Sequence, residues 1–147
     1  MDGDRAANRC PIGDDSMKRL IPLVFGLGIS ATAVLAIPPL REVTQVREGL
    51  ITAGMAIELG DNCGDVSVRL IRGLNYLSSL KSQARDLGYS DDQIEAYVED
   101  RAEKARLEGI ARARLAELGV VAGQGETYCA VAKAQISQDT AVGRLLR

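Results

Sequence analysis

The side chains that could do chemistry in this chain are carboxylates, arginines, tyrosines and three cysteines, because the sequence contains no histidine. Histidine is the commonest general base and the commonest metal ligand in proteins. Its absence excludes serine–histidine–aspartate triads, histidine-ligated haem and most catalytic zinc sites. Tryptophan is also absent, and the four tyrosines are scattered along the chain. The sequence therefore also lacks the clustered aromatic faces of a base-stacking site.

Two groups of carboxylates are candidates for a cation site or for acid–base catalysis. The turn Asp61-Asn-Cys-Gly-Asp65 carries two carboxylates, but it lacks the ligand ladder and the terminal glutamate of a calcium-binding loop. Glu95, Glu99 and Glu103 recur at helical spacing, with basic residues interleaved among them. We interpret the first group as turn and cap residues and the second as a solvated helix face. The sequence therefore predicts no catalytic residue, no metal site and no cofactor.

Two segments near the C-terminus could contact a ligand or a partner. The loop Gly123-Gln-Gly125 could offer backbone amides to an anion, but the full phosphate-binding pattern is missing, which favours a flexible connection. The tail places two arginines around an apolar pair, in the order Arg144, Leu145, Leu146, Arg147. This tail is a candidate partner contact, and the alternative is that it packs into a groove of its own domain.

The front of the chain has the pattern of a secretory signal. The basic segment Met17-Lys-Arg19 is followed by the uncharged apolar run Leu20–Ala36, which ends in small residues. A basic start, an apolar stretch and a small-residue end are the three parts of a cleavable signal peptide. We expect cleavage after Ala36, with Ala33 as the alternative, and Met17 is a better start for such a signal than Met1.

The signal sets the expected domain boundaries and the expected compartment. Residues 1–36 are predicted to be a polar leader and signal peptide, and residues 37–147 an exported domain in the periplasm or outside the cell. The alternative is an inner-membrane anchor, because the uncharged run from Leu20 to Leu40 is just long enough to cross a bilayer. Pro22, Gly26 and Gly28 within the run, and its small-residue end, favour the signal.

After removal of the signal, two cysteines remain in a compartment that permits disulfides, Cys63 and Cys129. Neither belongs to a Cys-x-x-Cys motif, so a structural bridge is favoured over a redox role. The helix order agrees with a bridge, since short connections make successive helices antiparallel and place the starts of the second and fourth helices at one end.

Helical periodicity predicts an all-α fold, a small up-down bundle of about four helices with one disulfide. In the first helix the apolar positions are Val43, Val46, Leu50, Gly54 and Ile57. The helices are expected to run from Leu40 to a stop at Gly60-Asp-Asn62, from a cap at Asp65 to Leu87, from Ile94 to Leu118, and through Tyr128–Gln135.

The junction before the third helix carries the sharpest local signal. Ser90 and Gln93 have the spacing of a capping box, and Tyr89 and Ile94 occupy the positions of a hydrophobic staple. Within the third helix, Asp100–Lys104 and Glu108–Arg112 are favourable pairs four residues apart. Gly88 and Gly119 are expected to end the second and third helices.

The chain resembles a family of short exported alphaproteobacterial proteins that is known only as a domain of unknown function. The resemblance lies in Cys63-Gly-Asp, Gly88-Tyr-Ser, Tyr128-Cys129 and the closing Gly143-Arg-Leu-Leu. It covers nearly all of the predicted mature chain. It implies export and a helical domain, and it implies no activity.

These observations predict a non-enzymatic periplasmic protein that interacts with, or assists, an unknown envelope protein. A formal charge of −2 with interspersed signs gives no field for nucleic acid, which is excluded as a partner, and a membrane is expected only if the segment Leu20 to Leu40 is uncleaved. The main alternative is a holdase chaperone or stress protein that exposes apolar helix faces. A membrane-anchored helical protein and a carboxylate-dependent enzyme are the remaining alternatives.

Overall fold

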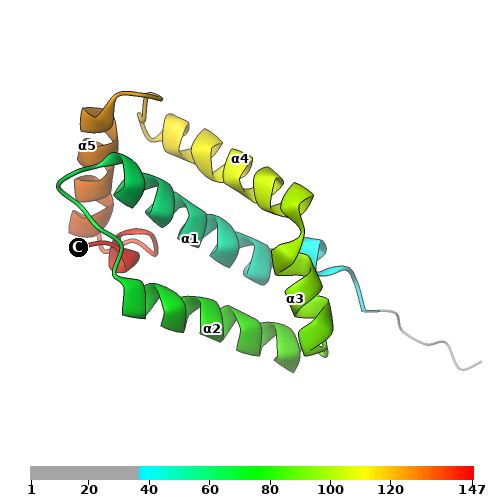
Figure 1. Ribbon diagram of the computed structural model, residues 1–147. Helices are drawn as coiled ribbons and strands as arrows, with labels where there is room; N and C mark the ends of the chain where they lie inside the picture. Colours follow the sequence, from blue (N-terminus) through cyan, green and yellow to red (C-terminus); the bar gives the residue numbers. More distant parts are fainter. Residues whose placement is uncertain (1–36) are drawn as a thin grey trace, which may run out of the picture. The chain divides into compact units, whose positions relative to one another are not determined.

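The computed structural model describes residues 37–147, and the predicted signal peptide lies outside this part of the chain. These residues form five α-helices and two short 3-10 helices (Figure 1). The prediction of an all-α fold with one disulfide is confirmed. The helices are η1 (Leu40–Glu42), α1 (Thr44–Asn62), α2 (Leu70–Asp86), α3 (Asp91–Glu99), α4 (Arg101–Glu117), α5 (Gly125–Ser137) and η2 (Gly143–Leu145).

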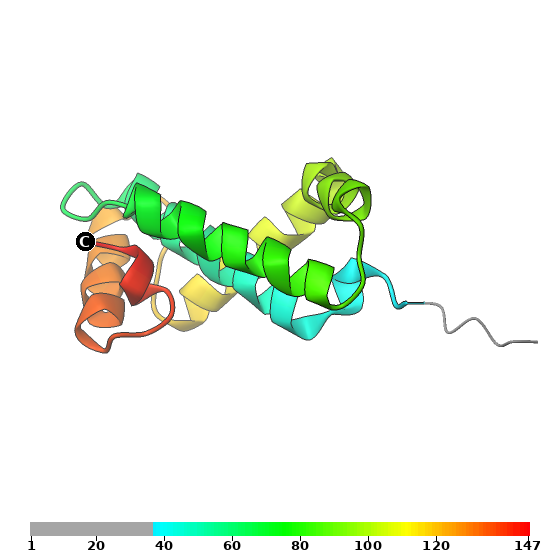
Figure 2. The same cartoon turned by 90° about the horizontal axis from the view of Figure 1, so that it is seen from below.

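Helix α1 is the central element, and α2, α4 and α5 all pack against it. α4 crosses α1 at Gly54, where an added Cβ would lie 3.5 Å from the Cβ of Ala111. The two views show α2 alongside α1 and α5 across the C-terminal end of α1 (Figures 1 and 2). An ion pair between Arg114 and Glu48, 2.6 Å apart, also joins α4 to α1. The small residues at the crossing allow the two helix backbones to approach closely.

The third helix of the sequence prediction is two helices, because the chain breaks at Asp100. The Asp100 backbone is extended, and its carboxylate accepts hydrogen bonds from the amides of Ala102 (2.8 Å) and Glu103 (3.0 Å). This is N-cap geometry, which satisfies amides that the first turn of a helix leaves unpaired. The side chain of Asp100 therefore caps α4, and its predicted role as a partner of Lys104 is wrong.

The second helix begins at Leu70 and not at Asp65, because the preceding residues pair with the C-terminal tail. The Ser67 amide donates to the carbonyl of Arg147, the Arg147 amide donates to the carbonyl of Ser67 (both 3.0 Å), and Arg69 donates to Leu145 (2.8 Å). An isolated antiparallel bridge joins Val68 to Leu146. Residues 67–69 thus satisfy their backbone groups across the fold instead of within a helix.

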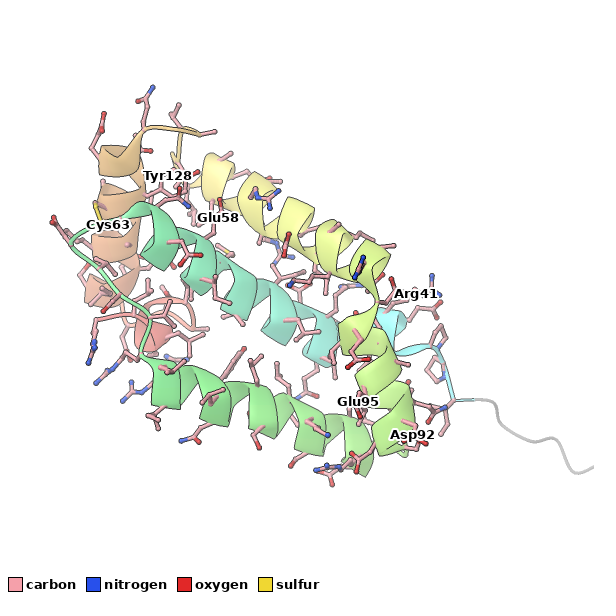
Figure 3. All side chains as sticks on the ribbon, viewed as in Figure 1. Arg41, Glu58, Cys63, Asp92, Glu95 and Tyr128 are labelled. Carbon is pink, nitrogen blue, oxygen red and sulfur yellow. A yellow bond between two sulfur atoms is a disulfide. The ribbon has the colours of Figure 1, made fainter. Side chains whose placement is uncertain are left out.

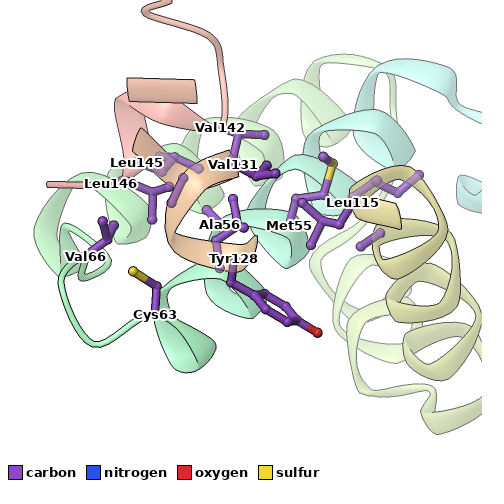
Figure 4. Packing of buried hydrophobic residues seen from close by; sticks show 14 of the residues in the cluster. Met55, Ala56, Cys63, Val66, Leu115, Tyr128, Val131, Val142, Leu145 and Leu146 are labelled. Atoms are coloured by element: carbon purple, nitrogen blue, oxygen red, sulfur yellow. The ribbon is translucent and has the colours of Figure 1, made fainter. Parts of the chain in front are cut away.

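The main core lies where α1, α4 and α5 meet the tail (Figure 4). Its largest fully buried side chains are at most 2 % exposed, and they are Ile51, Leu59, Leu115 and Leu146. Ile57, which the periodicity assigns to the core, is 49 % exposed. That assignment is wrong, because the buried face of α1 turns towards α5 at its C-terminal end.

A second, smaller core closes the other end of the fold, around Leu40, Val46, Ala84, Tyr89 and Ile94. The predicted capping box is confirmed: Ser90 accepts from the Gln93 amide (3.3 Å), and the Gln93 side chain accepts from the Ser90 amide (2.9 Å). Tyr89 and Ile94, the two staple residues, are both buried here.

Candidate functional site

The predicted disulfide between Cys63 and Cys129 is confirmed, with 4.9 Å between the two Cα atoms. Its place in the fold differs from the expected one. Cys63 is the residue that ends α1, with its amide bonded to the Leu59 carbonyl (3.1 Å), and it does not start the second helix. Figure 3 shows Cys63 where the end of α1 meets α5. The bridge therefore ties α5 to the central helix, and a disulfide of this kind fits a periplasmic or extracellular protein.

Of the four tail residues that were candidates for a partner contact, two are buried and two are exposed. Leu145 and Leu146 are 4 % and 2 % exposed and lie in the main core, close to Val131 and Val142 (Figure 4). The apolar pair packs on its own domain and presents no surface to a partner. Arg144 and Arg147 remain exposed.

The tail is held tightly against the end of α5. The Gly143 amide donates to the Thr140 hydroxyl (3.0 Å). A Cβ on Gly143 would lie 2.8 Å from the backbone nitrogen of Ile136. The main chain of α5 cannot shift as easily as a flexible side chain, so this contact would be a clash. Glycine is therefore required at this position for the tail to reach the core.

The carboxylates that the sequence analysis considered do not come together in one site. Asp65 forms an exposed ion pair with Lys133, 2.7 Å away, and this hydrogen bond lowers the pKa of Asp65. Glu95 is exposed on α3 (Figure 3), whereas Glu103 belongs to α4 and is only 9 % exposed. Among residues 37–147, no group of three or more cysteine, aspartate or glutamate side chains is placed to hold a metal ion.

Glu103 is buried, which is the exception to the predicted solvated face, and it forms a cluster with exposed Arg106 and half-buried Tyr97. The Arg106 Nε donates to both carboxylate oxygens (3.1 and 3.0 Å), and the Tyr97 hydroxyl donates to Oε1 (3.0 Å). The hydrogen bond from Arg106 lowers the pKa of Glu103. Burial, reinforced by the bond to Glu103, raises the pKa of Tyr97 to about 12. This cluster fixes the corner between α3 and α4.

We expect Glu103→Gln to lower the free energy of unfolding at pH 7 by about 1–3 kcal/mol, the usual cost of losing hydrogen bonds to a charged group. Because the pKa of Glu103 is lowered in the fold, its contribution is present above the unfolded value, near 4.3, and is lost as pH falls through the folded value. Urea denaturation from pH 3 to 7 measures this.

The difference between wild type and Glu103→Gln should shrink as the pH falls. Exposed Glu95→Gln is the matched control and should change stability by less than about 0.5 kcal/mol. Equal pH dependence of wild type and Glu103→Gln would contradict the assigned role of the cluster.

An apolar groove lies between α2 on one side and α3 and α4 on the other, with α1 as its floor. Two adjacent cavities of about 450 and 200 Å³ form it. Both are lined by Leu50, Leu77, Tyr97 and Val98, so they are continuous. We call the two cavities together the apolar groove.

The lining of the apolar groove is mostly aliphatic, and two residues of its floor are small. Leu77 and Val98, on opposite walls, are 38 % and 50 % exposed, and Ile57 at one end is 49 % exposed. Ala53 and Gly54 from α1 form part of the floor. Large exposed side chains above a small-residue floor make a channel into which another apolar element could fit.

Charges of both signs border the apolar groove. The larger cavity includes Lys81 and Glu95, and the smaller one includes Lys104 and Glu108. Lys81 lies 3.6 Å from Asp91, and Glu108 lies 3.3 Å from Arg112. Glu95 and Lys104 form no ion pair with any residue in 37–147. The rim therefore offers one carboxylate and one ammonium to a partner.

The sequence analysis missed this groove. Leu77 and Val98 fall on the apolar stripes of the predicted second and third helices, and periodicity does not show which parts of such stripes the packing of the helices leaves open. The structure shows that α2 leaves most of its apolar side chains uncovered, since only Leu80 and Ala84 of this helix are buried.

Comparison with known proteins gives one match. A family model described as a family of unknown function, DUF5333, matches residues 38–147, which is nearly the whole of the predicted domain. No curated protein and no solved structure matches the chain. Within residues 37–147, no helix has both the length and the apolar character that a membrane span requires.

Proposed function

The chain belongs to the DUF5333 family, a family of unknown function, and we propose that its helical domain is an exported, non-enzymatic binding module. Its ligand is an amphipathic helix of an envelope protein, held in the apolar groove. The observation that carries this proposal is the groove itself, an open and mostly aliphatic channel bordered by charges.

The groove has the features of helix-in-groove recognition, in which the apolar face of one helix inserts between the helices of another protein. A helix has a diameter of about 10–12 Å with its side chains and needs a floor of small residues to approach closely. Ala53 and Gly54 provide such a floor, and Leu77 and Val98 provide the walls. The ligand should present large aliphatic side chains three and four residues apart.

The charged residues at the rim of the groove indicate which charges the bound helix should carry beside its apolar face. Glu95 and Lys104 have no ion-pair partner among residues 37–147, and they border different cavities. A ligand with a basic residue at one end of its apolar face and an acidic residue at the other would match both. Such rim charges act mainly on orientation and partner choice, because exposed ion pairs contribute little to affinity.

Two further observations support export and binding without catalysis. The disulfide supports an oxidising compartment, in agreement with the signal predicted for residues 1–36. The groove is lined by aliphatic side chains, and its one tyrosine, Tyr97, already donates its hydroxyl to Glu103 (3.0 Å). The lining therefore favours a bound apolar face over a reacting group.

The proposal is tested by photocrosslinking in cells that make the full chain with p-benzoylphenylalanine in place of Leu77. We expect a crosslink to one envelope protein, within a segment whose sequence has helical apolar spacing. Leu87, the C-cap residue of α2, does not line the groove and is 50 % exposed, so it is the matched control position and should give no such product.

A synthetic peptide of the crosslinked segment then provides the affinity test. Val98→Glu places a charge in the groove and should weaken peptide binding at least tenfold, because burying an unpaired carboxylate is costly. Leu87→Glu should leave the affinity unchanged. Crosslinks from Leu77 to many unrelated proteins would indicate a holdase, and equal products from both positions would contradict the groove as a binding site.

A further inference from the structure

Four exposed arginines gather where the tail meets the start of α2. Backbone pairing between residues 67–69 and 145–147 holds the two segments together, and Arg72 donates to the carbonyl of Arg144 (3.2 Å). Two hollows of about 510 and 400 Å³ lie here and share Arg72 and Asn75. We call this surface the basic patch, and its arginines are Arg69, Arg72, Arg144 and Arg147.

Little negative charge offsets the basic patch. Asp139 lies 3.6 Å from Arg144. Asp65, the other nearby acid, pairs with Lys133 of α5 at 2.7 Å. Although the whole chain has a formal charge of −2, this surface is locally positive.

The basic patch also carries the most exposed large apolar side chains of residues 37–147. Leu70 and Ile71, in the first turn of α2, are 68 % and 71 % exposed and line the same hollow as Arg69, Arg72 and Arg147. Adjacent arginines and protruding aliphatic side chains are the two features that bind a surface to the interface of an anionic bilayer. A nucleic acid would use the arginines but would leave Leu70 and Ile71 in water.

We propose that the basic patch docks the protein on an anionic phospholipid bilayer, with the arginines at the headgroup phosphates and Leu70 and Ile71 inserted at the interface. This inference does not depend on the proposed function of the apolar groove. The groove is lined by the C-terminal half of α2 and the patch by its N-terminal part, so a docked domain keeps the groove open to a partner.

The absence of tryptophan from the chain provides a site-specific test. In the full chain, Ile71→Trp places a single tryptophan in the basic patch, and Leu87→Trp places one at the C-cap of α2, about 24 Å away at 1.5 Å per residue. With vesicles of phosphatidylglycerol and phosphatidylcholine, we expect a blue shift of tryptophan emission for Ile71→Trp and none for Leu87→Trp. With pure phosphatidylcholine vesicles, neither should shift.

The contribution of the arginines to bilayer binding is tested by adding Arg69→Gln and Arg147→Gln to the Ile71→Trp chain. We expect the partition coefficient on phosphatidylglycerol vesicles to fall roughly 25-fold, about fivefold for each charge removed. Arg101→Gln/Arg112→Gln removes two exposed arginines of α4 with the same change in net charge, and it should leave binding nearly unchanged.

Three other outcomes of these experiments would overturn the proposal. A blue shift for Leu87→Trp alone would mean that another part of the chain meets the bilayer. Equal loss of binding with both arginine pairs would mean a response to net charge only. A blue shift of Ile71→Trp abolished by millimolar inorganic phosphate at constant ionic strength would assign the arginines to a free phosphate ligand instead of a lipid surface.

Discussion

Replacing both cysteines, Cys63→Ser/Cys129→Ser, should lower the free energy of unfolding by about 4 kcal/mol while the helical fold is retained. The bridge closes a loop with a sequence separation of 66 residues, and in the chain-entropy model a loop of this length gives that value. Because small domains have about 5–15 kcal/mol in total, the change is a large share of the stability.

The place of the bridge in the fold explains why helical structure should survive its loss. α5 also packs on α1 through Tyr128 and Ala132, which are 6 % and 0 % exposed. The disulfide therefore reinforces an interface that hydrophobic burial already forms, and it does not replace that interface.

Urea denaturation followed by far-ultraviolet circular dichroism measures this effect. The double variant should show native helical signal in buffer and a much lower midpoint. Wild type under a reducing agent is the control and should unfold at nearly the midpoint of the variant. An unchanged midpoint in both would show that the bridge does not constrain the unfolded chain, and loss of helix in buffer would show that α5 cannot dock without it.

The features that the sequence predicted correctly are those that depend on neighbouring residues. Gly88 and Gly119 have φ values of +96° and +102°, a conformation that glycine adopts without strain, and each follows the end of a helix as expected. The Ser90–Gln93 capping box likewise needs only two side chains and one turn. The cysteine pair could be predicted from its count and the expected compartment.

The features that the sequence missed depend on contacts between distant segments. The start of α2 moves to Leu70 because residues 67–69 pair with the tail, and one of these contacts joins Ser67 to Arg147, 80 positions away. The same pairing buries Leu145 and Leu146 and gathers the arginines of the basic patch. No local pattern specifies such pairing, so neither the patch nor the groove could be read from periodicity.

Helix α1 shows the same limit within a single element. Its apolar residues lie on more than one face, and periodicity alone selected a stripe ending at Ile57. In the fold, α5 crosses the end of α1 and covers the face of Leu59, which is 0 % exposed, whereas Ile57 points towards the groove and is 49 % exposed. Substitutions at Leu59 and Ile57 can therefore show which face of α1 is buried, the one in the fold or the one predicted by periodicity.

We expect Leu59→Ala to lower the free energy of unfolding by about 2–5 kcal/mol, the range for removing a fully buried leucine side chain and leaving a cavity. Leu59 lies in the main core with Cys63, Tyr128 and Ala132, so the cavity would open between α1 and α5. Ile57→Ala removes a side chain of similar size from a half-exposed position and should cost less than about 1 kcal/mol.

Urea denaturation of the two variants, with the disulfide intact in each, decides between the alternatives. The denaturant dependence of unfolding should be the same for both, so that the difference in midpoint reports stability alone. A larger loss for Ile57→Ala than for Leu59→Ala would mean that the face of α1 predicted by periodicity is the buried one. In that case α5 could not lie across the end of α1, and the apolar groove, which has Ile57 in its lining, would be filled by another part of the fold.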